Sequence, residues 1–397
     1  MKHLVPTIKY SCLQGSFWMS FCICFSYASI YLLSRGYSNS QIGIVIAVAG
    51  VISSVMQPLV AGLAEETGRF TLRRLILFLS MIMLLSAGIL LIPQLHFLWN
   101  AVLYVVLLAT LQILTPLVNA IGMEWINKGI SVNFGLARGV GSIAYAGISF
   151  VAGIVIEHYS ATTVPVFIIF CYLLVFSAAY VFQLPAKPQA SAVSSNAAPG
   201  TEEQTGEQSF FRTYRKFFVL LIGISFAFIS HNMLNNYMFQ VMTYHQGGSA
   251  ETGIASGIAA ALELPTMIAF SYIIKKVSSG TLLKVSCIFF ALKAFLTFMA
   301  TSITGVYLAQ LAQIGGFALS VPASVYYTNS LIRPKDRARG QSFMTVTNTV
   351  GSIFGSTVGG FILDQRGVSS MLMIATAAGV LGTVLVFFST EKCQDIL

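Results

Sequence analysis

The chain has 397 residues, of which 56% are hydrophobic and only 9% are charged, and its formal net charge is +9 at pH 7. An ordinary soluble domain carries about 25% charged residues, so this composition excludes a soluble globular protein. The apolar residues fall in blocks of roughly 18 to 25, the length that a helix needs to cross about 30 Å of hydrocarbon. The sequence therefore predicts an all-α integral membrane protein.

Twelve apolar spans follow one another along the chain, separated by short polar loops. They cover about 11–34, 41–64, 74–93, 97–125, 138–157, 162–183, 214–243, 251–274, 281–300, 303–328, 340–363 and 368–389. Between the sixth and seventh spans the sequence is rich in Ala, Ser, Pro and Glu without an apolar period, which is typical of a flexible linker. We therefore predict twelve transmembrane helices in two six-helix bundles, residues 1–183 and 210–397, joined by the linker 184–209.

The basic residues indicate how the spans are oriented. Only Arg35 and Arg366 fall in loops on one side of the predicted membrane, and Lys293 falls within a span. The other Lys and Arg residues, out of 22 in the chain, lie on the opposite side with both termini and the linker. Basic loops favour the cytoplasm, so we expect a multi-pass protein of the cell membrane with both termini cytoplasmic. The orientation of the chain in the lipid bilayer explains its positive charge, and no nucleic-acid partner is expected.

The sequence contains no motif for a cofactor, a metal or an enzymatic reaction. Its six cysteines form no CxxC pair and have no spacing suited to zinc, so we interpret them as packing residues with free thiols. It also lacks a Walker A loop, an HExxH motif and a GxSxG motif. We therefore expect no cofactor, no metal and no enzyme activity.

An acid and a base face each other across the loop between the fourth and fifth spans. Glu124 stands at the end of one apolar run and Arg138 at the start of the next. Ionisable groups at membrane depth are costly and are by default functional, so these two residues form our first site hypothesis. The alternative is an interfacial ion pair that only closes the loop.

The second half has one acid and one base well inside its spans, Glu263 in the eighth and Lys293 in the ninth. Each is about twelve residues from a span end, near mid-depth at about 1.5 Å per residue. Because an isolated charge there is costly, we expect the two to pair or Glu263 to stay protonated, which suits proton coupling. The alternative is a buried strut between helices.

The seventh span contains a polar stretch from His231 to Tyr237. Amides and a phenol suit a hydroxylated solute, so Asn232, Asn236 and Tyr237 are predicted substrate contacts. His231 is a candidate second proton site because histidine titrates near neutral pH. The alternative for His231 is a fixed hydrogen-bonding residue.

Weak internal similarity supports two related halves. An Ala-Arg-Gly opens the fifth span at 137–139 and the eleventh at 338–340, and a Gly-Ser-Ile follows each, at 141–143 and 351–353. The two matches need different registers, so they indicate similarity between the halves but do not align them. Parallel halves with a substrate between them at mid-depth are one of the transporter architectures.

The loop between the second and third spans reads AGLAEETGR from Ala61 to Arg69. It resembles the cytoplasmic signature of the major facilitator superfamily, a Gly-x-Leu-Ala-Asp-x-x-Gly-Arg pattern, and here includes Gly62, Glu65, Gly68 and Arg69. Ala61 replaces the first glycine, and Glu65 replaces the aspartate but keeps the charge for capping a helix or pairing with an arginine. The resemblance implies the fold of that superfamily, two pseudo-symmetric six-helix bundles. The alternative is a turn with solvated charges.

Over nearly its whole length the chain also resembles the lactose permease group, the oligosaccharide and nucleoside proton symporters. The stretches that carry the resemblance are Ser16–Met19, Gln57–Leu59, Glu124 and Phe134–Arg138 leading to Tyr145. The resemblance implies that Glu124 and Arg138 bind sugar hydroxyls and that Tyr145 stacks against the sugar ring. The chemistry agrees, because a carboxylate accepts from hydroxyls, a guanidinium donates to them and an aromatic face covers a pyranose. The permease's histidine and glutamate of span ten have no counterpart in 317–322.

Together these features predict a monomeric secondary active transporter that imports a small hydroxylated solute, a sugar or an oligosaccharide, together with protons by alternating access. Nucleoside import is an open alternative, and so is export of a drug or a sugar by the same fold. The fifth span lacks the glycine-proline signature of the superfamily's proton antiporters, which favours uptake. A membrane-embedded enzyme or sensor without transport is the remaining alternative.

Overall fold

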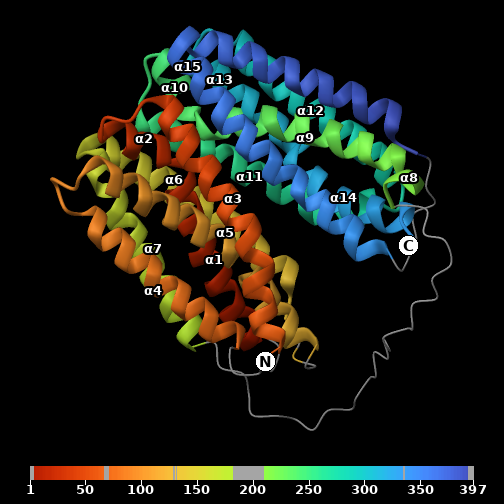
Figure 1. The fold of residues 1–397 in the computed structure, drawn as a ribbon, viewed down its shortest axis with the longest axis horizontal. Coiled ribbons are helices and arrows are strands. Elements are labelled where there is room, and N and C mark those ends of the chain that lie inside the picture. The colour runs from red at the N-terminus through yellow and green to blue at the C-terminus, as the bar shows by residue number, and fades with distance from the viewer. Residues whose placement is uncertain are drawn as a thin grey trace.

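The computed structural model describes residues 4–66, 71–127, 130, 132–181, 210–333 and 336–391. Within these residues the regular secondary structure is helical throughout (Figure 1). The helices of the first half are α1 (Leu4–Ser26), α2 (Ala28–Ser34), α3 (Asn39–Glu66), α4 (Leu72–Leu90), α5 (Phe97–Asn127), α6 (Phe134–His158), η1 (Ala161–Thr163) and α7 (Val164–Val181). Those of the second half are α8 (Phe210–Thr213), α9 (Arg215–Asn236), α10 (Met238–Tyr244), α11 (Ser249–Ile273), α12 (Ser279–Met299), α13 (Ile303–Gln310), η2 (Leu311–Ile314), α14 (Phe317–Leu331) and α15 (Arg337–Ser389).

Ten helices are long and apolar enough to cross a membrane, counted over the described residues. α1 and α2, bent by 45° where they meet, form one further, broken span. α15 has 53 residues, about 80 Å at 1.5 Å per residue, which exceeds twice the hydrocarbon thickness. It breaks at Gly367, whose φ of 76° suits glycine, and so contains two spans. The predicted twelve-span fold is confirmed.

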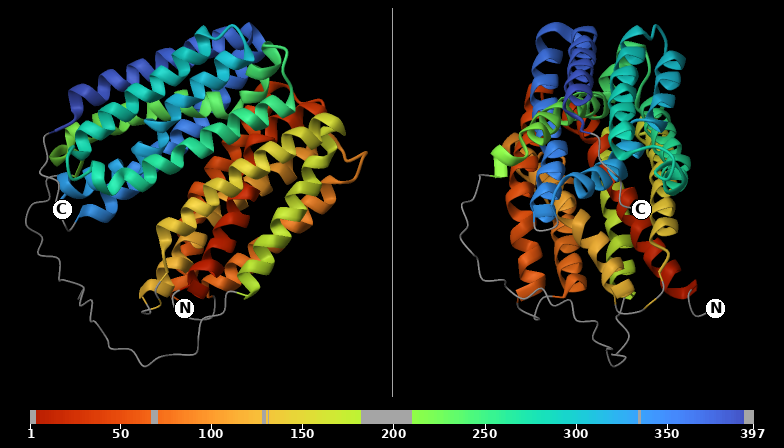
Figure 2. Two further views of the ribbon diagram at one scale, coloured as in Figure 1. Left: turned by 180° about the vertical axis from the view of Figure 1, so that it is seen from behind. Right: turned by 90° about the vertical axis from the view of Figure 1, so that its right-hand side faces the viewer.

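The helices form two bundles, α1 to α7 and α8 to α15, which lie against each other like the arms of a V (Figures 1 and 2). The arms meet at the distal end, where α2 leads into α3 and α10 into α11. They diverge at the terminal end, where α1 and α8 begin and α7 and α15 end. The main contacts between the halves are those of α3 with α15 and of α6 with α11. A site shared by both halves therefore lies along these contacts.

Large apolar side chains cover the outside of both bundles. Phe388 is 86% exposed and Tyr272 76%, whereas Tyr104 and Tyr172 are fully buried inside the first bundle. Contiguous apolar surface is unfavourable in water and is the normal surface of a protein in lipid. The pattern of exposure therefore agrees with a chain that spans the bilayer.

Polar side chains determine where several spans begin. Thr71, Asn133, Ser278 and Ser302 each accept a hydrogen bond from the backbone N–H three residues on, at the starts of α4, α6, α12 and α13. Such a cap satisfies one of the donors that a helix N-terminus leaves without a partner. The cap at Asn133 fixes the start of α6 and so places Arg138 in its second turn.

Some of the predicted features involve residues that the structure does not describe. The linker 184–209 lies outside the described residues, as do Gly68 and Arg69 of the predicted signature. Gly62 and Glu65 belong to the last turns of α3. The bundle limits at 183 and 210 stay predictions.

Candidate functional site

Arg138 lies between the first helix of the chain and the second half. Its Nη1 donates a hydrogen bond to Ser142 Oγ at 2.9 Å, and its Cζ lies 3.9 Å from the centre of the Trp18 ring of α1. At this distance the guanidinium is attracted to the negative face of the indole. Glu263 of α11 acts on the same guanidinium electrostatically. Glu124, half-buried near the end of α5, is not among the described partners of Arg138.

Trp18 is fixed by a group of amide and phenol side chains. Its Nε1 donates to Gln14 Oε1 at 3.0 Å, and Gln14 Nε2 donates to Tyr10 OH at 2.6 Å and to Asn119 Oδ1 at 3.1 Å. These bonds connect α1 to the part of α5 just before Glu124. Trp18 itself is only half-buried, so part of its ring can contact a ligand.

Tyr145 lies on α6 seven residues after Arg138, about two helical turns away. It is half-buried, and its hydroxyl lies 2.7 Å from Ser26 Oγ. Arg138 of the first half thus lies within electrostatic range of a carboxyl group of the second half, and Tyr145 lies two turns further along the same helix.

Gln313 of η2 joins the two deep charges of the second half. Its Nε2 donates to Glu263 Oε1 at 2.8 Å, and its Oε1 accepts from Lys293 Nζ at 2.8 Å. Lys293 is only 1% exposed and Gln313 only 3%. One neutral amide therefore bonds to both side chains, and it stands in place of the direct pairing that was one of the two expectations.

His231 continues this polar line into α9. Lys293 Nζ lies 3.5 Å from Asn235 Oδ1, and Asn235 Nδ2 lies 2.8 Å from His231 Nε2. The imidazole is stacked on Phe317, with ring centres 5.3 Å apart and planes at 8°. His231 is 5% exposed, its ring face stacks on Phe317 and its Nε2 contacts Asn235, so it is a fixed member of the network in this conformation.

The predicted substrate contacts of span seven take part in helix packing. Asn232 is half-buried, and its Nδ2 donates to the Phe228 carbonyl of the same helix at 2.9 Å. Asn236 Nδ2 donates to Ser356 Oγ at 2.8 Å, and Tyr237, fully buried, donates to the Ser356 carbonyl at 2.6 Å. Asn236 and Tyr237 therefore hold α9 against α15, and their part in binding stays a prediction.

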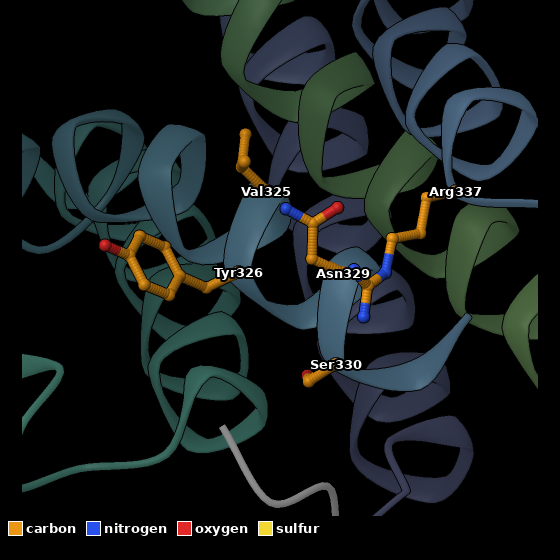
Figure 3. Close-up of a pocket in the computed structure, with 5 residues that line it drawn as sticks. All are labelled: Val325, Tyr326, Asn329, Ser330 and Arg337. Carbon is orange, nitrogen blue, oxygen red and sulfur yellow. The ribbon is translucent and has the colours of Figure 1, made fainter. Parts of the chain in front are cut away.

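A separate cavity of about 400 Å³ lies at the end of α14 and the start of α15 (Figure 3). Its lining residues are Val325, Tyr326, Asn329, Ser330 and Arg337. The predicted site residues do not line it. Among the described residues, no group of three His, Cys, Asp or Glu side chains is arranged to hold a metal ion.

Sequence reasoning missed several residues of this network, namely Tyr10, Gln14, Ser142, Asn235 and Gln313. The signal was present, because an amide inside an apolar span must find a hydrogen-bond partner. What the sequence lacked was the partner, since the bonds of Gln14 to Asn119, of Asn235 to Lys293 and of Gln313 to its two partners all reach another helix. Gln313 is the clearest case, because its two partners come from α11 and α12.

Two six-helix bundles with a polar site between them define a secondary transporter of the major facilitator fold. The chain matches the MFS_1 like family over residues 17–374, and it belongs to that family. It is 23% identical to a maltose permease of Geobacillus stearothermophilus over 373 residues, which cover 93% of this chain and 90% of the permease.

Solved structures show the same fold. The nucleoside transporter NupG superposes with a TM-score of 0.71 at 17% identity, covering 98% of both chains. A peptide transporter POT in complex with sulfate superposes with a TM-score of 0.71 at 11% identity, covering 96% of this chain and 94% of that one. These relatives are transporters and not enzymes, so this protein is a multi-pass major facilitator transporter.

Proposed function

We propose that this transporter imports a sugar or a nucleoside together with protons, by alternating access between its two halves. The observation that carries the proposal is a line of polar side chains that crosses from one half to the other. It runs from Trp18 and Arg138 to Glu263, and on through Gln313 to Lys293. A solute bound at one end of this line is electrostatically coupled to a titratable carboxyl group at its centre.

The chemistry around Arg138 suits a hydroxylated ring. The guanidinium donates hydrogen bonds, the Glu263 carboxylate accepts them, and Trp18 and Tyr145 offer aromatic faces. Maltose and nucleosides, for which two of the similar proteins are named, both combine hydroxyl groups with a ring. We assign Glu124 to the same site, as a further acceptor at the end of α5.

Coupling follows from the position of Glu263. While ionised, it accepts from Gln313, whose own oxygen accepts from Lys293. A proton on Glu263 turns one of its oxygens into a donor and removes the negative charge that faces Arg138. Proton and solute therefore change the same local electrostatic balance, which is what symport requires. His231 at the end of the line is a second site for the proton.

The distribution of Lys and Arg residues indicates which end of the molecule faces the cytoplasm. The terminal end carries most of the Lys and Arg residues, so we assign it to the cytoplasm of the cell that bears this membrane. With the arms of the V apart at that end, the conformation is inward-facing. Because the two halves of one chain build the whole site, a monomer suffices for transport.

The test is uptake by proteoliposomes under an imposed pH gradient, acid outside, with labelled maltose and labelled uridine as the two probes. We expect one of them to accumulate above its external concentration and to stop accumulating when a protonophore is added. Accumulation only under the reversed gradient would identify an exporter. Binding of a probe without movement under either gradient would contradict transport coupling altogether.

Single substitutions assign the roles. Arg138→Lys keeps the charge but loses the fork of donors, so we expect probe affinity to fall at least about tenfold, as a lost charge-assisted bond would give. Glu263→Gln should still allow exchange of probe down its gradient while losing proton-driven accumulation. Arg337→Lys and Glu251→Gln, outside the proposed site, are the matched controls and should behave like the wild type.

A further inference from the structure

At the distal end, Asp364 of α15 reaches across to the first helical turn of α3 in the other half. Its Oδ1 accepts from Asn39 N at 3.0 Å and from Asn39 Nδ2 at 2.9 Å, and its Oδ2 accepts from Ser40 N at 2.7 Å. A carboxylate at this position binds N–H groups that have no partner within the helix, and it meets the positive end of the helix dipole. One acidic side chain therefore caps a helix of the opposite half.

The second contact between the halves contains the same arrangement. Glu157, near the end of α6, accepts from Ser249 N at the start of α11 with its Oε2 at 2.6 Å. As with Asp364, the acid comes from the end of one helix and the capped N-terminus from the other half. The two contacts run in opposite directions: a first-half acid caps α11, and a second-half acid caps α3.

The two contacts agree residue by residue in spacing. Ser149, Gly153 and Glu157 follow one another at intervals of four, and so do Ser356, Gly360 and Asp364. On the capped helices, a glycine follows the first helical residue by four positions, at 43 after Asn39 and at 253 after Ser249. The sequences SFVAGIVIE (149–157) and STVGGFILD (356–364) are thus equivalent segments of the two halves.

Close packing accompanies the equivalent spacing. A Cβ on Gly43 or Gly253 would overlap the carbonyl oxygen of Ser356 or Ser149, respectively. A tyrosine at the break in the first span of each half binds the same two carbonyls. Tyr27 OH donates to the Ser149 oxygen, and the equivalent tyrosine in the second half donates to the Ser356 oxygen at 2.6 Å.

The turns before the capped helices are also alike. Gly36 and Gln246, each three residues before the first helical residue, have φ of 84° and 66°. Ser38 N donates to Gln41 Oε1 at 2.9 Å, and Gly248 N donates to a glutamate oxygen of its own helix at 2.7 Å. Each helix thus caps the preceding N–H with its own side chain and leaves the next N–H groups to the acid of the other half.

We infer that Glu157 and Asp364 are the gating residues that hold the distal end closed, and that the transport cycle breaks both bonds each time that end opens. Opening there must separate α6 from α11 and α15 from α3, because these are the contacts that close it. Each carboxylate then exchanges backbone N–H partners for water, and the helix it capped loses an anion at its N-terminus. The inference rests on the alternating access proposed above and not on the identity of the solute.

The experiment measures the distance between spin labels across the distal end by pulsed electron resonance. Labels are attached at Tyr159→Cys in the first half and Tyr244→Cys in the second, both exposed, in a background whose native cysteines are replaced by alanine. Glu157→Gln and Asp364→Asn keep the size of each side chain and remove its charge. We expect each to raise the ratio of distally open to closed molecules about fivefold, and the double variant about 25-fold, since every fivefold step corresponds to about 1 kcal/mol.

Glu251→Gln is the matched control. It neutralises an acid at the same N-terminus of α11, but one that bonds to its own half, so the distance distribution should stay as in the wild type. A second label pair at the terminal end, Leu136→Cys and Val325→Cys, separates gating from unfolding. Gating shortens the terminal distance while the distal distance grows, whereas loss of structure broadens both.

Two results would overturn the inference. One is a distal distance distribution in the double variant that matches the wild type. The other is an equal shift in the Glu251→Gln control, which would mean that any loss of charge at this end has the same effect.

Discussion

Replacing Gln313 by methionine tests whether the amide joins the two deep charges. Methionine has nearly the same length and volume but can neither donate to Glu263 nor accept from Lys293. Both lost bonds join Gln313 to a titratable side chain, that of the buried Lys293 and that of the half-buried Glu263, and a hydrogen bond to a charged group contributes about 1.5 to 3 kcal/mol. We therefore expect Gln313→Met to lower the free energy of unfolding by about 3 to 6 kcal/mol.

Gln310, one turn earlier, provides a matched comparison. It is 1% exposed, and among the described residues its Nε2 donates to the neutral Val306 carbonyl of its own helix, at 3.2 Å. Gln310→Met should therefore cost about 1 kcal/mol. At about 2 °C per kcal/mol, the melting temperature in detergent should fall by roughly 6 °C or more for Gln313→Met and by about 2 °C for Gln310→Met.

Thermal unfolding of the purified variants, followed by intrinsic fluorescence, decides the matter. Equal falls in melting temperature for the two variants would refute the idea that Gln313 stabilises the protein by bonding to Glu263 and Lys293. Proton-driven accumulation gives a second reading, since Gln313→Met cuts the line between Glu263 and Lys293 and should abolish it while Gln310→Met retains it.

Two further predictions concern an aromatic and a histidine. Trp18→Leu should weaken binding of the transported probe about tenfold, as loss of the cation–π contact and of an aromatic face would give, whereas Trp99→Leu, at an exposed tryptophan, should not; equal affinities of the two variants would contradict this role. Burial lowers the pKa of His245 below its ordinary value of about 6.5, so its contribution to stability is present above that pH and lost as the pH falls toward the lowered value. The melting temperature of the wild type should thus drop more steeply below about pH 6.5 than that of His245→Gln, and parallel curves would count against it.

Composition and the length of the apolar runs were enough to predict the fold. Most predicted spans begin or end within a few residues of the helices, because lipid demands long apolar helices regardless of which neighbours they pack against. The break between the last two spans also follows from the sequence, since Gly367 stands between two apolar runs. Local chemistry sets these boundaries, and it can be read without knowledge of tertiary contacts.

The site was harder to predict from the sequence, because each polar residue in a span needs a hydrogen-bond partner and the sequence does not say which residue that partner is. The depths of Glu263 and Lys293 could be counted along their spans, but Gln313 comes from a third span and enters between them. Asn236 and Tyr237 have the chemistry of a sugar contact, and in the structure this chemistry serves helix packing. Both uses of an amide look the same in one sequence.

The relation between the halves was equally hidden. The Ala-Arg-Gly repeat at 137–139 and 338–340 can be seen in the sequence. It falls in a different register from the segments 149–157 and 356–364, which occupy equivalent places in the two halves. In those segments only a serine, a valine, a glycine, a three-residue apolar run and a terminal acid correspond. Packing constrains shape and the position of a charge more strongly than residue identity, so the equivalence appears only when the contacts are known.

The site and the distal gate are connected through the break in the first span. Ser26 Oγ lies 2.7 Å from the hydroxyl of Tyr145, and the next residue, Tyr27, donates to the carbonyl of Ser149, one turn further along α6. A solute that moves Tyr145 therefore acts on the same turn of α6 that packs against α11. The second half has the equivalent contact, that of Tyr237 with the Ser356 carbonyl, but one turn before Ser356 it carries Ser352 in place of an aromatic residue. Equivalent contacts thus lie at the distal end of both halves, and each involves a predicted binding residue: Tyr145 acts through Ser26 in the first half, and Tyr237 donates directly to the Ser356 carbonyl in the second.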